Sequence, residues 1–148
     1  MRLREIERTD IKDILDIRVS TIENHFSMTD LAEVGVTQES IAEWLEGSVK
    51  GWVCENSGES AGFALADSKT AEVLVVACYP KYERRGIGKT LMLKVHEWLW
   101  SFDHDEIWLW SDSDPGIRAY GFYRKLGYEP AGVTKGSDEL LILKRRES

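Results

Sequence analysis

The fold is decided by the stretch Val73-Leu-Val-Val-Ala-Cys-Tyr-Pro-Lys-Tyr-Glu-Arg-Arg-Gly-Ile-Gly-Lys-Thr90. Its first six residues form an uninterrupted apolar run, which predicts a strand covered on both faces. Tyr79-Pro80 ends this strand, because proline has no N–H to donate to a ladder. Two glycines then lead into residues 87–99, where apolar side chains recur on one broad helical face. The stretch therefore predicts a buried strand, a short basic turn and a helix in direct succession.

The turn between this strand and this helix has the features of a phosphate site. The first turn of a helix offers unpaired N–H groups and the positive end of the helix dipole, which together bind anions. Glycine lets the backbone approach an oxygen cluster without a Cβ in the way, and basic side chains add charge for a diphosphate. We interpret the turn as a pyrophosphate site, with a plain basic loop before an amphipathic helix as the alternative. Its residues are Arg84, Arg85, Gly86, Ile87, Gly88 and Lys89.

Two nucleotide-binding patterns are excluded at this turn. The triphosphate P-loop, G-x-x-x-x-G-K-(S/T), needs a glycine five positions before Gly88, where the chain has Glu83. The dinucleotide pattern G-x-G-x-x-G fails because Leu91 stands in place of the last glycine. A phosphate ligand of another kind is therefore expected.

The rest of the chain predicts further strands and helices around one sheet, in the order β-α-α-β-β-β-α-β-α-β-β. The expected fold class is mixed α/β (α+β), a single twisted mixed sheet of about six to seven strands flanked by about four helices, in one domain over residues 1–148. Helices are expected after caps at Asp10 and Thr37, at Ile87, and at Asp114-Pro115. The expected strands are 3–7, 51–55, 61–66, 73–78, 107–110, 128–133 and 140–143.

Composition limits the class of protein and its partners. The chain is 43% hydrophobic and 30% charged, which is typical of a soluble globular protein. Its net charge of −7 argues against nucleic acid as a partner, and no apolar run approaches membrane length, so we expect a cytoplasmic protein. Cys54 and Cys78 are then free thiols. No residue spacing suggests a metal, and Asp103-His104-Asp105 is expected to be a solvated turn.

Two motifs resemble one known family. Residues 84–89, after a strand that ends in Tyr79-Pro80, look like motif A of the GNAT superfamily of N-acetyltransferases, (Q/R)-x-x-G-x-(G/A). The departure is Glu83, where the family prefers Gln or Arg. A second match, residues 118–128, looks like the family's A-x-x-x-Y-x-x-x-G-(F/Y) helix. Gly116 stands where the family often has Asn, so that contact to the cofactor is absent or replaced.

The resemblance implies an enzyme that transfers an acetyl group from acetyl-CoA to a primary amine by direct attack through a tetrahedral intermediate. Residues 84–89 would hold the pyrophosphate, and the backbone of Val76, Ala77 and Cys78 would pair with the pantetheine arm like an added strand. The amide of Cys78 or its neighbour would polarise the thioester carbonyl. Tyr123 would be the general acid, with a core aromatic residue as the alternative. A non-catalytic acyl-CoA-binding module is the alternative function.

The general base and the acceptor site are less well defined. Glu72 lies fourteen residues before Gly86, the spacing of the catalytic glutamate in histone-type members, although a solvated charge at a strand end is an equal alternative. Ser111 stands where other members have a base, and an amine deprotonated through waters would need no dedicated side chain. The resemblance implies an acceptor pocket built from residues 20–36, near His25, and from the last two strands. It also implies that a homodimer is possible.

Overall fold

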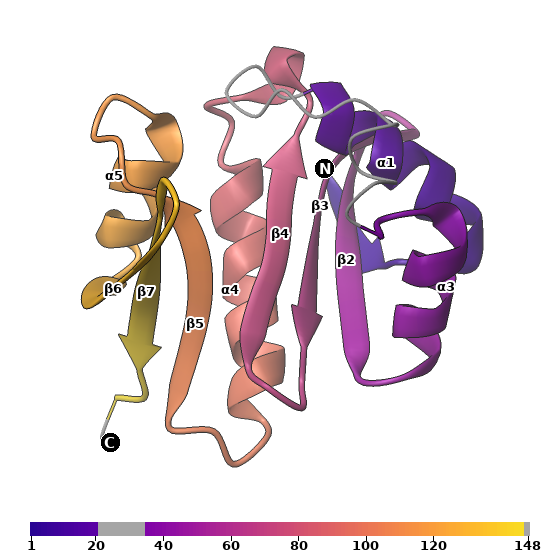
Figure 1. Ribbon diagram of the computed structural model, residues 1–148. Coiled ribbons are helices and arrows are strands. Elements are labelled where there is room, and N and C mark those ends of the chain that lie inside the picture. Colours follow the sequence, from indigo (N-terminus) through magenta and orange to yellow (C-terminus); the bar gives the residue numbers. More distant parts are fainter. Residues whose placement is uncertain (21–34, 147–148) are drawn as a thin grey trace.

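The computed structural model describes residues 1–20 and 35–146, and its centre is a seven-stranded sheet (Figure 1). The strand order is β1-β2-β3-β4-β5-β7-β6, and all neighbours are antiparallel except β4 and β5. The predicted element order and the mixed sheet are confirmed. His25 and most of the expected acceptor segment lie outside the described residues. The strands are β1 (Arg2–Glu5), β2 (Val49–Asn56), β3 (Glu59–Asp67), β4 (Glu72–Cys78), β5 (Glu106–Asp112), β6 (Glu129–Lys135) and β7 (Asp138–Lys144).

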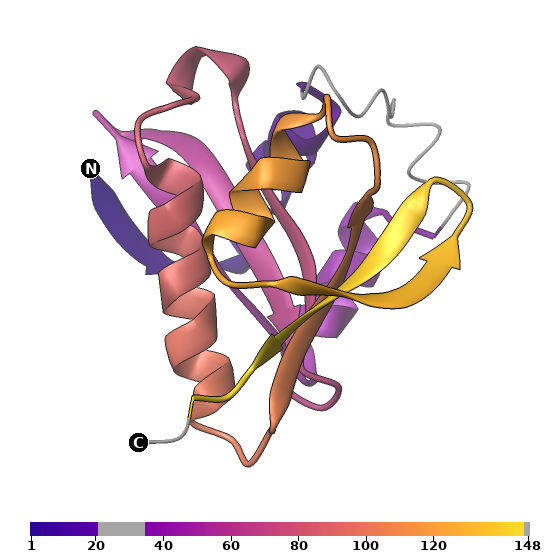
Figure 2. The same cartoon turned by 90° about the vertical axis from the view of Figure 1, so that its left-hand side faces the viewer.

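Helices cover both faces of the sheet, as Figures 1 and 2 show. Helices α1 (Ile11–Ser20) and α3 (Gln38–Glu46) lie on one face, and α4 (Ile87–Trp100) and α5 (Arg118–Lys125) lie on the other. Two 3-10 turns, η1 (Arg8–Asp10) and η2 (Pro80–Tyr82), lead into α1 and follow β4. Within the described ranges, no helix is long and apolar enough to cross a membrane.

Helix α4 is the element packed most deeply against the sheet. Leu91, Val95 and Leu99 are fully buried on one of its faces, at the helical spacing that the sequence predicted. The approach to β3 is close at Gly62, where a Cβ would lie 2.8 Å from Cγ2 of Ile87. This glycine lets the beginning of α4 lie directly on the sheet, which fixes where the basic turn before it is held.

The predicted start of α5 is wrong. The expectation was a helix opened by Asp114-Pro115, whereas α5 begins at Arg118. The Asp114 carboxylate instead accepts a hydrogen bond from the Gly116 N–H at 2.9 Å, and its carbonyl accepts one from the Ile117 N–H at 3.0 Å. These two bonds close a turn of their own, so the helix starts only after it.

The sheet opens between its two central strands. Only one residue pair, Glu72 with Trp108, joins β4 to β5 in the described part of the chain, and Figure 1 shows the strands separating beyond it. A bulge accompanies the opening: Val73 and Val75 pair with consecutive residues of β3, so Leu74 is an extra residue on β4. The prediction of a strand covered on both faces is wrong for β4. Apart from Val73 its residues are half-buried or exposed, because β5 turns away from that edge.

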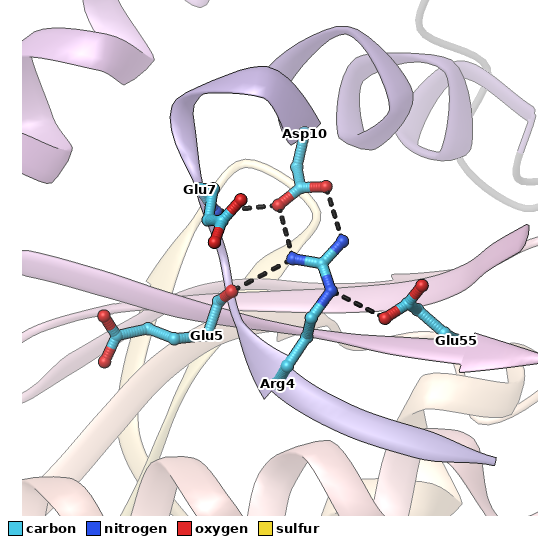
Figure 3. A network of polar contacts seen from close by, with 5 residues as sticks. All are labelled: Arg4, Glu5, Glu7, Asp10 and Glu55. Carbon is cyan, nitrogen blue, oxygen red and sulfur yellow. Dashed lines mark hydrogen bonds and ion pairs between the residues drawn. The ribbon is translucent and has the colours of Figure 1, made fainter. Parts of the chain in front are cut away.

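A half-buried arginine fastens the edge strand β1 to the rest of the fold (Figure 3). Both Nη atoms of Arg4 donate to the Asp10 carboxylate at 2.8 Å, and its Nε donates to Glu55 on β2 at 2.6 Å. The Asp10 carboxylate also accepts the Glu7 N–H at 2.7 Å. The guanidinium holds the pKa of Asp10 below its usual range by hydrogen bonding. The predicted cap at Asp10 therefore lies elsewhere: Glu7 is the N-cap of η1, and Asp10, the third residue of that turn, bonds back to it while it pairs with Arg4.

Candidate active site

The basic turn leads into an open helix N-terminus. Gly86 is the N-cap of α4, with φ 79° and ψ 9°, in the left-handed region that favours glycine. Having no side chain, it leaves the first turn of α4 without a side-chain cap. Arg84 also has a positive φ of 65°, which costs a non-glycine residue about 1 kcal/mol or more. Left-handed residues directly before a helix N-terminus are a backbone arrangement that can form an anion site.

The basic side chains of this turn are exposed. Arg84, Arg85 and Lys89 all reach solvent, and the Arg85 guanidinium lies 5.6 Å from the centre of the Tyr82 ring. Tyr82 is buried, and its hydroxyl donates to the Glu59 carboxylate on β3 at 2.6 Å. The turn is therefore anchored to the sheet through Tyr82 and carries exposed positive charges, an arrangement suited to a multiply charged anion.

Gly88 has a packing role that the sequence did not indicate. A Cβ at this position would lie 3.1 Å from Cζ of Phe122 on α5. The glycine thus lets α5 approach the first turn of α4 closely. Because Gly88 has no side chain, it leaves room for the Phe122 ring as well as for a phosphate.

Glu83 is paired rather than free. Its carboxylate lies 2.6 Å from Nη1 of Arg118, the first residue of α5. The pair joins the two segments that carry the two sequence motifs. Sequence reasoning missed this partnership, since nothing local connects a loop residue to a helix so much later in the chain.

The open edge of β4 lies beside this turn. Val76, Ala77 and Cys78 pair with β3 on one side, and on the other side they have no strand partner in the described ranges. Such an edge presents N–H and C=O groups to an extended ligand. Cys78 is a free thiol, half-buried, and burial raises its pKa. Its side chain therefore stays a neutral packing group.

Tyr123 lies on α5 with its ring in the core. It is 9% exposed, packs against Phe122 and Tyr128, and burial raises the pKa of its phenol. Its hydroxyl makes no hydrogen bond to another described residue. The Arg18 guanidinium on α1 acts on the phenol electrostatically and lowers its pKa, against the larger effect of burial.

A second tyrosine and a histidine support this ring from behind. The rings of Tyr128 and Tyr123 pack edge to face, with their centroids 5.8 Å apart. The Tyr128 hydroxyl lies 2.7 Å from Nε2 of His96. His96 is 8% exposed on α4, and burial lowers its pKa to about 4. The imidazole is therefore neutral at physiological pH and serves as a hydrogen-bond partner. This agrees with the structural role that a residue on the buried face of α4 suggests.

Glu72 lies at the closed end of the opening, opposite Trp108. Burial and the nearby Asp67 raise its pKa, and Lys135 on β6 lowers it. A raised pKa is what a base needs near neutral pH. Glu72 and Cys78 are at opposite ends of β4, and six strand residues span about 20 Å. Ser111, the other position considered for a base, is buried on β5.

A cavity of about 270 Å³ adjoins the bulge of β4 on the face covered by α1 and α3. Its walls are apolar, with Leu74 and Val75 from β4 and Trp44 from α3, and Arg18 is its one charged wall residue among those described. Arg18 thus lines the cavity and also acts electrostatically on the Tyr123 phenol. No local pattern in the sequence indicates this cavity. In the described part of the chain, no His, Cys, Asp and Glu cluster could hold a metal.

Comparison with known sequences gives one clear match. The sequence model of the acetyltransferase (GNAT) family matches residues 11–128. This span includes the open edge of β4, the basic turn, α5 and Tyr128. No curated protein gives a significant sequence match.

Solved structures share the fold over nearly the whole chain. The PaiA N-acetyltransferase from Thermoplasma acidophilum, in complex with coenzyme A, is 17% identical, with 98% of this chain and 100% of that chain covered and a TM-score of 0.83. The ribosomal-protein-S18-alanine N-acetyltransferase from Escherichia coli is 19% identical, with 95% and 90% covered and a TM-score of 0.71. An aminoglycoside 6'-acetyltransferase type Ii is 20% identical, with 97% of each chain covered and a TM-score of 0.76. At these identities the likeness establishes the fold.

Proposed function

Because the chain belongs to the acetyltransferase (GNAT) family and is an acyltransferase, we propose that it transfers an acetyl group from acetyl-CoA to a primary amine. The observation that carries the proposal is the continuity of two surfaces. An unpartnered edge on β4 runs directly into a basic turn and the uncapped N-terminus of α4. An extended arm that ends in a diphosphate matches that pair of surfaces in order.

The residues of this chain fit coenzyme A. The left-handed Gly86 and the open first turn of α4 suit the pyrophosphate, with Arg84, Arg85 and Lys89 supplying charge. The backbone of residues 76–78 suits the amides of the pantetheine arm. When bound, acetyl-CoA would supply the acetyl group as a thioester, and a backbone N–H of β4 would polarise its carbonyl.

Tyr123 is the proposed general acid. Its phenol keeps its proton across neutral pH because burial raises the pKa, so it can donate that proton to a leaving thiolate. Support for this role comes from the hydroxyl, which has no hydrogen-bond partner among the described residues, and from the ring, which Phe122 and Tyr128 hold in place. A tyrosine that only filled the core would be expected to have a hydrogen-bond partner for its hydroxyl.

Glu72 is the proposed base, acting through water. Its distance along β4 from Cys78 excludes direct contact with a group bound at the strand's end. A chain of waters in the opening between β4 and β5 could carry a proton from the acceptor ammonium to the carboxylate. The acceptor itself stays general: the family's solved relatives include enzymes named for a ribosomal protein and for aminoglycosides. The net charge of −7 favours a cationic amine. The homodimer and the cytoplasmic location stay predictions.

The test of the function is thiol release from acetyl-CoA measured across a panel of amines. We expect at least one amine to raise the rate above hydrolysis, and Tyr123→Phe to lower kcat about a hundredfold, since general acid catalysis contributes on that order. The Kd for coenzyme A should stay unchanged. Binding of acetyl-CoA with no turnover on any amine would instead identify an acyl-CoA-binding module. A wild-type kcat in Tyr123→Phe would remove the acid assignment.

Glu72→Gln tests the base through the pH profile. A raised pKa places the acidic limb of kcat above pH 4.5, the ordinary value for this side chain, and the substitution should abolish that limb. Equal acidic limbs in the two proteins would show that the amine loses its proton to solvent alone.

A further inference from the structure

Glu83 has the wrong charge for the place it occupies. It precedes Arg84 in the basic turn, at the position where the family motif has Gln or Arg. A carboxylate there repels a pyrophosphate bound at the start of α4. An uncompensated Glu83 would therefore offset part of the attraction of the basic side chains.

The structure pairs this carboxylate with Arg118. Oε2 of Glu83 lies 2.6 Å from Nη1 of Arg118, and the two side chains are 31% and 47% exposed. Arg118 is the first residue of α5, a helix with no acidic residue in its first turn. A cation at that end is unfavourable, because the dipole of the helix is positive there, so Glu83 supplies the missing anion.

The pair lies beside the open end of β4. Both charges act on the Cys78 thiol, with opposite effects on its pKa, so both are close to it. Cys78 is the last residue of the strand edge proposed to bind the pantetheine arm. The Glu83–Arg118 pair is thus flanked by the two parts of the coenzyme A site, the edge of β4 and the basic turn.

We propose that Arg118 is a positioning residue for coenzyme A, which neutralises Glu83 so that the turn before α4 presents net positive charge to the pyrophosphate. This inference rests on the proposed function. Arg118, on α5, acts through Glu83. Its positive charge cancels the negative charge at position 83, where the motif otherwise has a neutral or basic side chain.

The experiment measures coenzyme A binding to the full chain by calorimetry, with KM for acetyl-CoA and kcat alongside. Arg118→Met should raise the Kd and the KM about tenfold, since an exposed carboxylate then faces the phosphates, while kcat stays within about twofold. Arg118→Lys keeps the charge and should retain most of the affinity. The decisive protein is Glu83→Gln with Arg118→Met, which should return the Kd to within about twofold of wild type.

Two further variants separate this role from others. Lys81→Met removes a positive charge two residues before Glu83 together with its own exposed ion pair to Glu59, and its Kd should stay within about twofold of wild type. Glu83→Gln alone should bind coenzyme A at least as tightly as wild type. If thermal unfolding shows that Arg118→Met does not fold, Glu83→Gln still tests the inference through its Kd for coenzyme A.

The outcomes are distinct. Arg118→Met with a wild-type Kd overturns the inference, as does a double variant that binds as weakly as Arg118→Met, because Arg118 would then contact the cofactor itself or act only on stability. Weaker binding by Glu83→Gln overturns it too. If the wild-type chain binds no coenzyme A, the proposed function falls and the inference falls with it.

Discussion

Acid should destabilise this protein through His96. The imidazole is buried, with a pKa of about 4 against 6.5 for an unhindered histidine. Between these values the unfolded chain binds a proton that the native protein does not, so the free energy of unfolding falls as pH falls. The full shift of about 2.5 pH units corresponds to about 3 kcal/mol, and about 2.5 kcal/mol of it should be lost between pH 7 and pH 4.5. That is a large share of the stability of an ordinary domain.

The assay is urea unfolding followed by tryptophan fluorescence at the two pH values. The comparison protein carries His96→Met and Tyr128→Phe, which removes both partners of the 2.7 Å hydrogen bond and leaves no orphaned hydroxyl. Other acid-sensitive groups, such as Asp10, contribute equally to both proteins. Wild type should therefore lose about 2.5 kcal/mol more than the double variant on acidification. Equal losses in the two proteins would refute the assignment of a buried neutral imidazole.

Two substitutions, Arg4→Met and Gly88→Ala, test the edge strand and the packing of α4, each against control variants, by the same assay at pH 7. Arg4→Met should lower the free energy of unfolding by about 2 to 3 kcal/mol, because it leaves the buried Asp10 carboxylate and the half-buried Glu55 carboxylate without their ion pair. Arg8→Met, which breaks an exposed contact of 3.9 Å, should cost less than about 0.5 kcal/mol. Similar losses would contradict this account of the network. Gly88→Ala should cost about 1 to 2 kcal/mol by pressing on Phe122, and Phe122→Leu should relieve much of that cost. Gly121→Ala, a helical glycine with open space around its Cβ position, should instead be neutral or stabilising, and an equal loss there would show that crowding is not the cause.

The sequence predicted the elements well because their signals are local. The apolar stripe of α4 is predicted from the three- and four-residue spacing of its apolar side chains, and the start of the helix is predicted from the glycine just before it. Both are present in the structure. The start of α5 was predicted too early for the same reason. Proline at 115 is a good first helical residue, but the Asp114 carboxylate closes a separate turn first. The residues from Asp114 to Arg118 are compatible both with a helix that starts at Pro115 and with a separate turn before the helix.

The sequence predicted the site residues less completely, because the site depends on contacts between distant elements. The apolar run of β4 predicts a strand covered on both faces, and only the pairing of β4 with β5 reveals the open edge. In the same way, the sequence marks Glu83 as a departure from a motif but contains no local sign of Arg118 as its partner. Register and side-chain pairing across the fold decide such features, and one sequence carries little information on either.

The single register pair between β4 and β5 has a consequence for how the protein opens. Hydrogen bonds link β1 to β4 in one continuous antiparallel ladder and β5 to β7 in another, with Glu72 and Trp108 as the only rung between them in the described chain. The two ladders are then expected to exchange their amide protons as separate blocks, with different opening free energies. A ligand that hydrogen-bonds along β4 while contacting α5 would bridge the blocks. Its binding should bring the two exchange rates together, which makes hydrogen exchange a readout of ligand contact that requires no catalysis.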